Sequence, residues 1–390
     1  MAADDMTPIS VESEGIRPAK GGRHLAVRFW RAASGFWRGS GAWGAWGLTA
    51  ALVGGTLLQL ALQFRLNYWN RDFFDAFGRR DGPALQAQVL MFLLLGGVSV
   101  VLAIVAVWTR MTTQRLWRAW LTRHLIDRWL AREAFHPLRF PSDEDRNPEF
   151  RIAEDARVAT DAPVSMAVGL LSALLNVVIF IGILWSVGGD LGVTVAGHAV
   201  TVPRYLVIAV LLYSAALTLA MTVIGRPMVP AIAAKNAAEA QFRSVASRLR
   251  ERGEAGELEG GAAEAHGLVS EAFATVIARW RDVRAEFMRI TVVIHGNNLM
   301  APIVGWILCA PKYLDGSMTL GEASQAVAAF VTVEASLNWL VENYGAVAEC
   351  LSSVNRVGLL LLALDEAVGV ERSRDMSPNA KPSTCPGPPD

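Results

Sequence analysis

The sequence predicts an all-α membrane protein with six transmembrane helices and long cytoplasmic extensions. Of its 390 residues, 53% are hydrophobic and only 18% are charged. The charged residues are concentrated in a few stretches, and long uncharged runs lie between them. Several of these runs exceed the roughly 20 apolar residues that a helix needs to cross the hydrocarbon core of a bilayer.

Residues 1–38 precede the first uncharged run and change in character along their length. They begin polar and acidic and then become basic and aromatic, with Arg28, Trp30 and Arg31 close together. We expect a cytoplasmic tail that ends in an interfacial helix, with its cations facing anionic lipid and its rings dipping inward.

The six spans follow from the distribution of charge. Two long charged stretches, 110–161 and 226–289, lie between spans, and we call them the excursions. Apolar residues keep their helical spacing into both. We therefore expect a transmembrane domain over 39–345, a cytoplasmic helix over 346–370 and a Pro-rich disordered tail over 371–390. The expected spans are 39–64, 84–109, 162–189, 205–225, 290–311 and 320–344.

The stretch 66–81 joins the first two spans and is rich in aromatic and charged residues. Its rings suit the headgroup level, where arginine and aspartate side chains can pair at the edge of the water. We expect a short hairpin there, and an interfacial anchor without a substrate role is an equally simple interpretation. Its polar motif consists of Asn70, Arg71, Asp72 and Asp75.

The positive-inside rule predicts the orientation. Ten arginines lie in 110–160, and nine arginines and Lys235 lie in 226–289, whereas the loops at 188–202 and 312–319 together hold one lysine. Both excursions and both termini are therefore expected in the cytoplasm of a multi-pass protein of the bacterial inner membrane. The arginines of 66–81 run against the rule, but three nearby aspartates offset them.

Span six carries polar side chains in the middle of the membrane. Glu334, Asn338 and Glu342 recur at intervals of four and therefore share one helical stripe. A carboxylate at mid-bilayer costs about 2.5–3.5 kcal/mol on insertion scales, so it is a candidate for a cavity or proton-coupling role. The alternative is a neutral or hydrogen-bonded glutamate that only stabilises the helix packing.

Span five adds His295, Asn297 and Asn298 near its cytoplasmic end. Span six runs in the opposite direction, so Glu342 is expected at a similar depth. A contact between His295 and Glu342 could relay a proton between a cavity and the cytoplasm. An interhelical hydrogen bond that only fixes the packing is the competing interpretation.

Several classes of function find no support in the sequence. A net charge of zero offers no basic footprint for a nucleic acid. The three cysteines and the scattered histidines lack the spacing of a metal site, so no metal is expected. No arrangement of residues typical of an enzyme active site is present either.

Five stretches, taken in order, carry a resemblance to a known family. The stretches are NYWNRDFFDAFGRRD from Asn67, NPEFRIAEDARVATDAP from Asn147, Gly225-Arg226-Pro227, AEAQFRSVASRLRE from Ala238 and WLVENYGAVAECLSSVNRV from Trp339. The whole pattern is similar to the SbmA/BacA and ABC-membrane-type-2 family, transmembrane domains of the ABC exporter type that move peptides, antibiotics or cobalamin-like molecules.

The resemblance implies a homodimer and a source of energy outside this chain. In family members with a fused ATPase, a Walker A loop binds the phosphates. The printed sequence has no GxxxxGK[ST] motif, so we expect no ATPase activity from this chain alone, no cofactor, and ATP only through a separate nucleotide-binding subunit. By analogy, the coupling segment that would touch this subunit includes Asn147, Pro148, Arg151 and Asp155.

Two functional interpretations remain open at this stage. The first is a transporter subunit in the lipid bilayer that moves a peptide or another bulky solute, driven by a separate ATPase or by the proton gradient. The second is a non-transporting protein, either a truncated fragment or a scaffold that pairs with a longer relative. The length of the spans and the amphipathic excursions favour the transporter, because drift would introduce charges that spans tolerate poorly.

Overall fold

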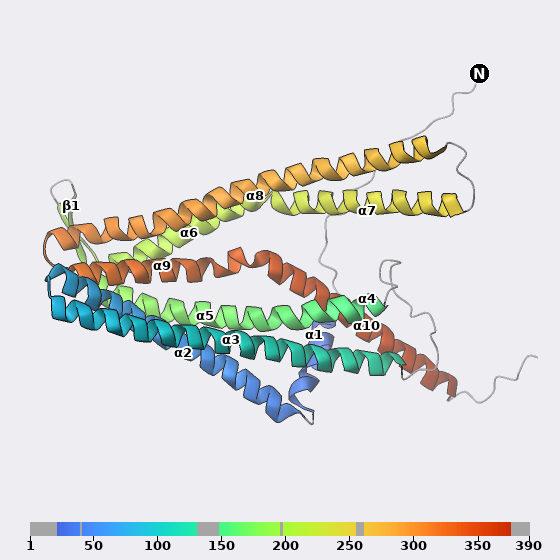
Figure 1. The fold of residues 1–390 in the computed structure, drawn as a ribbon, viewed down its shortest axis with the longest axis horizontal. Coiled ribbons are helices and arrows are strands. Elements are labelled where there is room, and N and C mark those ends of the chain that lie inside the picture. The colour runs from blue at the N-terminus through green and yellow to red at the C-terminus, as the bar shows by residue number, and fades with distance from the viewer. Residues whose placement is uncertain (1–21, 40, 131–147, 196–197, 255–260, 376–390) are drawn as a thin grey trace, which may run out of the picture. The chain divides into compact units, whose positions relative to one another are not determined.

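The computed structural model describes residues 22–39, 41–130, 148–195, 198–254 and 261–375. These residues are almost all helical (Figure 1). The helices are α1 (Gly22–Ala33), η1 (Ser34–Trp37), α2 (Ala42–Gly78), α3 (Gly82–Leu130), α4 (Pro148–Phe150), η3 (Arg151–Asp155), α5 (Ala156–Gly188), α6 (Tyr205–Gly225), α7 (Met228–Glu254), α8 (Gly261–Leu314), α9 (Leu320–Glu342) and α10 (Tyr344–Asp375). The N-terminal tail to residue 21 and the tail from residue 376 lie outside the described residues.

Six helical segments are long and apolar enough to cross a membrane, which confirms the six-span prediction. Each overlaps one of the runs expected from the sequence almost completely, and each extends beyond its run at one end or both. The segments are Ala42–Gly78, Gly82–Leu130, Arg151–Gly188, Tyr205–Glu254, Ala263–Leu314 and Leu320–Asp365.

The stretch 66–81 is not the hairpin that the sequence suggested. It continues α2 as a regular helix as far as Gly78, and only three residues separate α2 from α3. No glycine or proline interrupts 66–77, so nothing in the sequence breaks the helix earlier. The turn is tight because Arg80 adopts a left-handed conformation with φ of 56° and Asp81 Oδ1 accepts a hydrogen bond from the N–H of Ala84.

The loop between the third and fourth spans contains a β-hairpin that the sequence analysis did not anticipate. Strands β1 (Leu191–Val195) and β2 (His198–Val202) pair antiparallel, and Leu191 lies opposite Val202. Alternating valine and threonine residues suit a strand of this kind. Leu191 and Val202 pack against the neighbouring helices, so the hairpin is anchored at its base.

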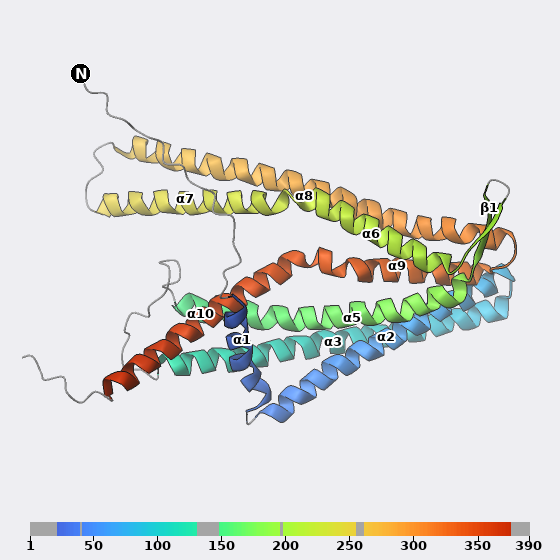
Figure 2. The ribbon, with the colours of Figure 1, turned by 180° about the vertical axis from the view of Figure 1, so that it is seen from behind.

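The excursions between spans are continuous extensions of the membrane helices. Helix α3 runs without a break to Leu130, and α7 follows α6 after the Gly225-Arg226-Pro227 junction. Helices α7 and α8 run side by side in both views (Figures 1 and 2). Phe242 of α7 meets Phe273 of α8, with 5.6 Å between ring centroids.

The structure divides into two compact units. The first contains residues 1–54, 105–168 and 345–390, and its core joins α1, the distal half of α3, the start of α5 and α10. Phe29 is fully buried in this core, whereas its neighbour Trp30 remains 45% exposed. The aromatic residues of α1 therefore do not all face lipid, because one of them packs inside the protein.

The second unit contains residues 55–104 and 169–344. Its core lies among α5, α6, α8 and α9, with a contribution from α2. Helix α9 is the most deeply buried of these, and small residues such as Ala323, Ala326 and Ala329 allow its neighbours to pack closely. This unit also contains the polar residues expected in spans five and six.

Candidate functional site

Glu334 lies in the buried part of α9 and accepts two hydrogen bonds on one oxygen. Glu334 is only 3% exposed to solvent. Asn297 of α8 donates its Nδ2 to Glu334 Oε1 at 3.1 Å, and Asn338, one turn along α9, donates to the same oxygen at 2.8 Å. The two amides hold the carboxyl group in one orientation and compensate part of the cost of burying it.

Hydroxyl groups of α6 complete this network. Tyr213 donates its OH to Asn297 Oδ1 at 2.9 Å, and Thr218 donates its Oγ1 to Asn338 Oδ1 at 2.8 Å. Because each amide oxygen already accepts a hydroxyl, each NH2 group is free to point at Glu334. Five side chains from α6, α8 and α9 therefore form one connected polar cluster inside the membrane-spanning part of the second unit, and we call it the Glu334 cluster.

The arrangement leaves the second carboxyl oxygen free to change its protonation state. Both amides donate to Oε1, and among the described residues no hydrogen bond engages Oε2 of Glu334. An oxygen that only accepts keeps its bonds whether the carboxyl group is ionised or neutral. A proton could therefore bind to or leave Oε2 without breaking the contacts that hold the side chain.

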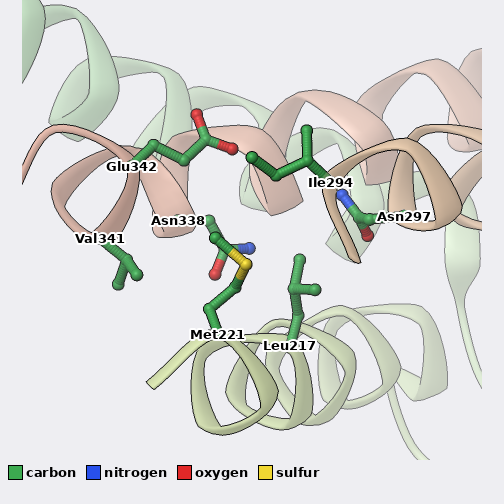
Figure 3. Close-up of a pocket in the computed structure, with 7 residues that line it drawn as sticks. All are labelled: Leu217, Met221, Ile294, Asn297, Asn338, Val341 and Glu342. Atoms are coloured by element: carbon green, nitrogen blue, oxygen red, sulfur yellow. The ribbon is translucent and has the colours of Figure 1, made fainter. Parts of the chain in front are cut away.

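A small pocket borders the Glu334 cluster (Figure 3). Its volume of about 10 Å³ is close to the space that one water molecule requires. Side chains from α6, α8 and α9 converge on it, and two of them, Asn297 and Asn338, also contact Glu334. The lining residues are Leu217, Met221, Ile294, Asn297, Asn338, Val341 and Glu342.

The stripe predicted on span six converges on this site. Asn338 and Glu342 line the pocket, and Glu334 reaches it through its hydrogen bond to Asn338. A pocket of this size admits water or a proton carrier and is far too small for a peptide. The pocket therefore brings one buried carboxyl group, that of Glu334, within a hydrogen-bonded neighbour of an exposed one, that of Glu342, and a proton could move between them through a water molecule.

The expected contact between His295 and Glu342 is not found in the part of the chain that the structure describes. His295 is exposed, as is Asn298, while Asn297 faces α9. Residues two positions apart on an α-helix differ by about 200° in direction, so Asn297 and His295 cannot both face the same neighbour. Of the polar residues named in span five, Asn297 is the one that contacts Glu334 of α9.

The polar motif at the end of α2 contacts the first turns of α9. Asp75 Oδ1 accepts the N–H of Gly321 at 2.9 Å, Arg71 Nη2 donates to Glu322 Oε1 at 2.9 Å, and Asn70 Oδ1 accepts Ser324 Oγ at 3.0 Å. The fourth residue of the motif, Asp72, instead pairs with Arg65 of its own helix at 3.6 Å. Three of the four residues therefore join two helices rather than anchor the chain in lipid.

The predicted coupling segment lies in the first unit and contains a π-helix. Asn147 is outside the described residues, and Pro148 begins α4. Arg151 and Asp155 are the first and last residues of the π-helix η3, and both are buried. Arg356 of α10 donates its Nε and Nη2 to the carboxylate of Asp155 at 2.8 and 2.6 Å. This bidentate ion pair ties the coupling segment to α10.

Three residues of these sites were missed by the sequence analysis. Tyr213 and Thr218 stand out as polar positions in an apolar span, a signal that could have marked them, although nothing in the sequence indicates their partners. Arg356 lies 201 positions from Asp155, so no local pattern connects them. Among the described residues, no group of three or more His, Cys, Asp or Glu side chains could hold a metal ion.

Comparisons with known proteins agree with this architecture. Residues 40–314 match the family described as ABC transporter transmembrane region 2. The chain is 26% identical over 328 residues to the inner membrane ABC transporter ATP-binding protein YddA of Escherichia coli, which covers 83% of this chain and 56% of that protein.

Two further relatives also match most of this chain over about half of their own length. One is ABC transporter D family member 2, chloroplastic, of Arabidopsis thaliana, which is 23% identical over 88% of this chain and 47% of its own length. The other is an uncharacterized ABC transporter ATP-binding protein of Haemophilus influenzae, which is 21% identical over 71% of this chain and 46% of its own length. The chain spans about half the length of these relatives.

The family match covers most of the chain, including five of the six spans and the Asn297 side of the Glu334 cluster. Sequence motifs, six apolar helical segments and the long extensions all point to the same family. The chain belongs to the ABC transporter transmembrane region 2 family.

Proposed function

We propose that this chain is the membrane-spanning part of a transporter that moves a bulky solute, such as a peptide, across the bacterial inner membrane. Its family membership and six apolar segments support a role in transport. The positive-inside count supports the bacterial inner membrane with both termini in the cytoplasm.

Proton coupling through Glu334 is the mechanism that the site geometry supports best. The single observation that carries it is a carboxyl group buried in α9 whose one oxygen is held by two amides. A buried carboxylate favours whichever conformation solvates it, and protonation removes that preference. Binding and release of a proton would thus shift the population between two states of the transporter.

A second candidate mechanism is coupling to ATP hydrolysis on a separate nucleotide-binding subunit. The observation that favours it is that two of the relatives are named ATP-binding proteins. In this mechanism, the segment that ends at Asp155 would receive the force, and Arg356 would pass it to α10.

The solute requires more space than the pocket of one chain offers. The pocket beside Glu334 is of water size, so the solute path has to lie elsewhere. We propose that two copies of the chain form a homodimer and enclose this path at the two-fold axis. Oligomers of identical chains most commonly adopt this symmetry.

The test is uptake of a labelled Pro-rich peptide into proteoliposomes that contain only this chain, with an imposed pH gradient and no nucleotide. A Glu334→Gln variant keeps the shape of the side chain but cannot titrate. Glu271→Gln, an exposed position on α8, serves as the matched control. We expect gradient-dependent uptake by the wild type and the control, and loss of at least tenfold in Glu334→Gln.

Three other results would change the proposal. Equal uptake by wild type and Glu334→Gln would make Glu334 a structural residue. Uptake that appears only when a nucleotide-binding partner and ATP are added would favour the second mechanism. Absence of uptake in both conditions would favour a scaffold or a fragment without transport activity.

A further inference from the structure

One face of α2 presents four polar side chains to the start of α9. Asn70, Arg71 and Asp75 contact α9 as described above, and Asn67 donates its Nδ2 to the carbonyl oxygen of Gln325 at 3.1 Å. Asn70 and Arg71 lie three and four residues after Asn67, and Asp75 lies four residues after Arg71, so the four positions share a face of α2. We call these contacts the α2–α9 clasp; its α9 side consists of Gly321, Glu322, Ser324 and Gln325. The end of α2 and the start of α9 are visible side by side in Figure 1.

The start of α9 is built for close approach of α2. A Cβ atom on Gly321 would lie 2.2 Å from the carbonyl oxygen of Arg71 and 2.5 Å from Cγ of Asp75, so only glycine fits there. Asp75 accepts the N–H of Gly321 in the first turn of α9, where a negative charge interacts favourably with the helix dipole. Glu322 is shared, because Oε2 accepts the N–H of Thr319 in a capping box while Oε1 accepts Arg71.

The clasp buries polar atoms that it does not satisfy. Gln325 is fully buried, and neither atom of its side-chain amide has a partner among the described residues. Asn67 Oδ1 is buried and unpartnered in the same way. Buried polar atoms without partners cost free energy, and water would restore their hydrogen bonds if the helices moved apart. These unpartnered atoms lower the cost of separating the two helices in water.

The opposite face of α9 is not suited to separation. Ala323, Val327 and Phe330 pack in the apolar core with α5, α6 and α8. Parting that surface would expose apolar area to water, whereas parting the clasp exposes groups that water can bind. If α9 loses a neighbour during a conformational change, the neighbour is α2.

We propose that the α2–α9 clasp is a gate that closes this end of the second unit to water and opens when α2 moves away from α9. The proposal rests on the transport function proposed above, because only a transporter needs this end to open in turn. Glu334 lies nine residues beyond Gln325 on α9, about 14 Å along the helix at 1.5 Å per residue. An open clasp would shorten the protein barrier between water and the Glu334 cluster.

The test measures how fast a membrane-impermeant thiol reagent reaches a cysteine at Gln325. Cys309, Cys350 and Cys385 are first replaced by serine, and the reagent is applied to the membrane face that labels Arg79→Cys in the exposed α2–α3 turn. We expect Arg71→Gln to raise the labelling rate of Gln325→Cys at least tenfold. Arg65→Gln removes an arginine whose one ion pair among the described residues is with Asp72 of the same helix, so it should leave the rate unchanged.

A cysteine at Ala329, in the apolar core, guards against simple unfolding. Equal labelling of Gln325→Cys in the Arg71→Gln and Arg65→Gln backgrounds would overturn the gate. Increased labelling at Ala329→Cys as well would indicate unfolding rather than opening and would also overturn it.

A disulfide between α2 and α9 tests independently whether the clasp has to open during transport. Asn70 Oδ1 and Ser324 Oγ are 3.0 Å apart, so cysteines at both positions should cross-link on oxidation. We expect the locked protein to lose uptake and dithiothreitol to restore it, whereas unchanged uptake in cross-linked protein would refute the gate. If the reduced protein and the wild type both lack uptake, the transport function fails, and the labelling rates alone decide whether the clasp opens.

Discussion

At the scale of residues, the orientation of two asparagine side chains explains the Glu334 cluster. Tyr213 and Thr218 donate to the amide oxygens of Asn297 and Asn338, which obliges both NH2 groups to face Glu334. The two hydroxyls of α6 therefore orient the carboxyl group of Glu334 indirectly, through the amides of Asn297 and Asn338. Loss of any one partner would leave a buried polar atom without its hydrogen bond.

We expect Asn297→Ala to destabilise the protein by about 1–3 kcal/mol, the usual cost of leaving buried polar groups unpaired. The substitution removes one donor to Glu334 Oε1 and the acceptor of Tyr213. Asn298→Ala is the matched control, because Asn298 is the exposed neighbour on the same helix and should change stability by less than about 0.5 kcal/mol. Unfolding in detergent measures both, and equal effects would contradict the role of Asn297.

At the scale of elements, the ion pair between Asp155 and Arg356 joins α10 to the π-helix. Asp155 is only 2% exposed, and Ser353 of α10 contributes a further contact to its carboxylate. π-Helical turns are rare and frequently occur at functional sites. Here the turn contains two buried charged residues, Arg151 and Asp155, whose side chains lie 3.6 Å apart.

We expect Arg356→Met to destabilise the first unit by about 3–5 kcal/mol, because it leaves Asp155 as a buried charge without its main partner. The double variant Asp155→Leu/Arg356→Met should recover only part of the loss, since it removes the buried carboxylate but also takes from buried Arg151 the partner that lies 3.6 Å away. Limited proteolysis after α10, together with unfolding in detergent, measures the effect.

The control for this pair is Arg157→Met. Arg157 pairs with Glu154 in the same region, but both side chains are about 40% exposed or more. Exposed pairs contribute about 0–1 kcal/mol, so this variant should remain close to the wild type. Similar losses in Arg157→Met and Arg356→Met would show that burial of Asp155 is not the cause.

The sequence predicted elements better than contacts between them. The spans follow from uncharged runs such as 84–109, because the bilayer imposes a length that can be counted in one dimension. The β-hairpin at 191–202 was missed, since its strands are short and lie inside a loop. The helical course of 66–78 was missed because its aromatic and charged composition resembled that of an interfacial turn.

The site shows the same limit. Periodicity placed Glu334, Asn338 and Glu342 on one face, and the structure brings them to one cluster and its pocket. Opposed helix directions indicated which end of α8 faces this part of α9 but not the rotation of α8 about its axis. That rotation, which selects Asn297 over His295, depends on the packing of neighbouring helices and cannot be read from one span.

At the scale of the whole molecule, the distribution of charge makes a statement about topology that is independent of side-chain contacts. The excursions in 110–160 and 226–289 contain nineteen arginines between them, whereas the loops at 188–202 and 312–319 contain a single lysine. A charge bias of this size in segments that flank spans usually sets the orientation of the protein. The proposed ATP mechanism requires that the excursions lie in the cytoplasm, where a nucleotide-binding subunit would contact them.

We therefore expect Glu251→Cys, near the end of α7, to be protected from an impermeant thiol reagent in intact cells and to react only after the membrane is made permeable. Asp315→Cys, in the loop between α8 and α9, should react in intact cells. One span separates it from α7 and one from the C-terminus, so it lies on the opposite side of the membrane from both. Both positions are exposed, so access to the membrane face alone decides the result. The variants are made in a chain without Cys309, Cys350 and Cys385. Reaction of Glu251→Cys in intact cells would reverse the orientation, and the nucleotide-binding partner would then have no cytoplasmic surface on the excursions to bind.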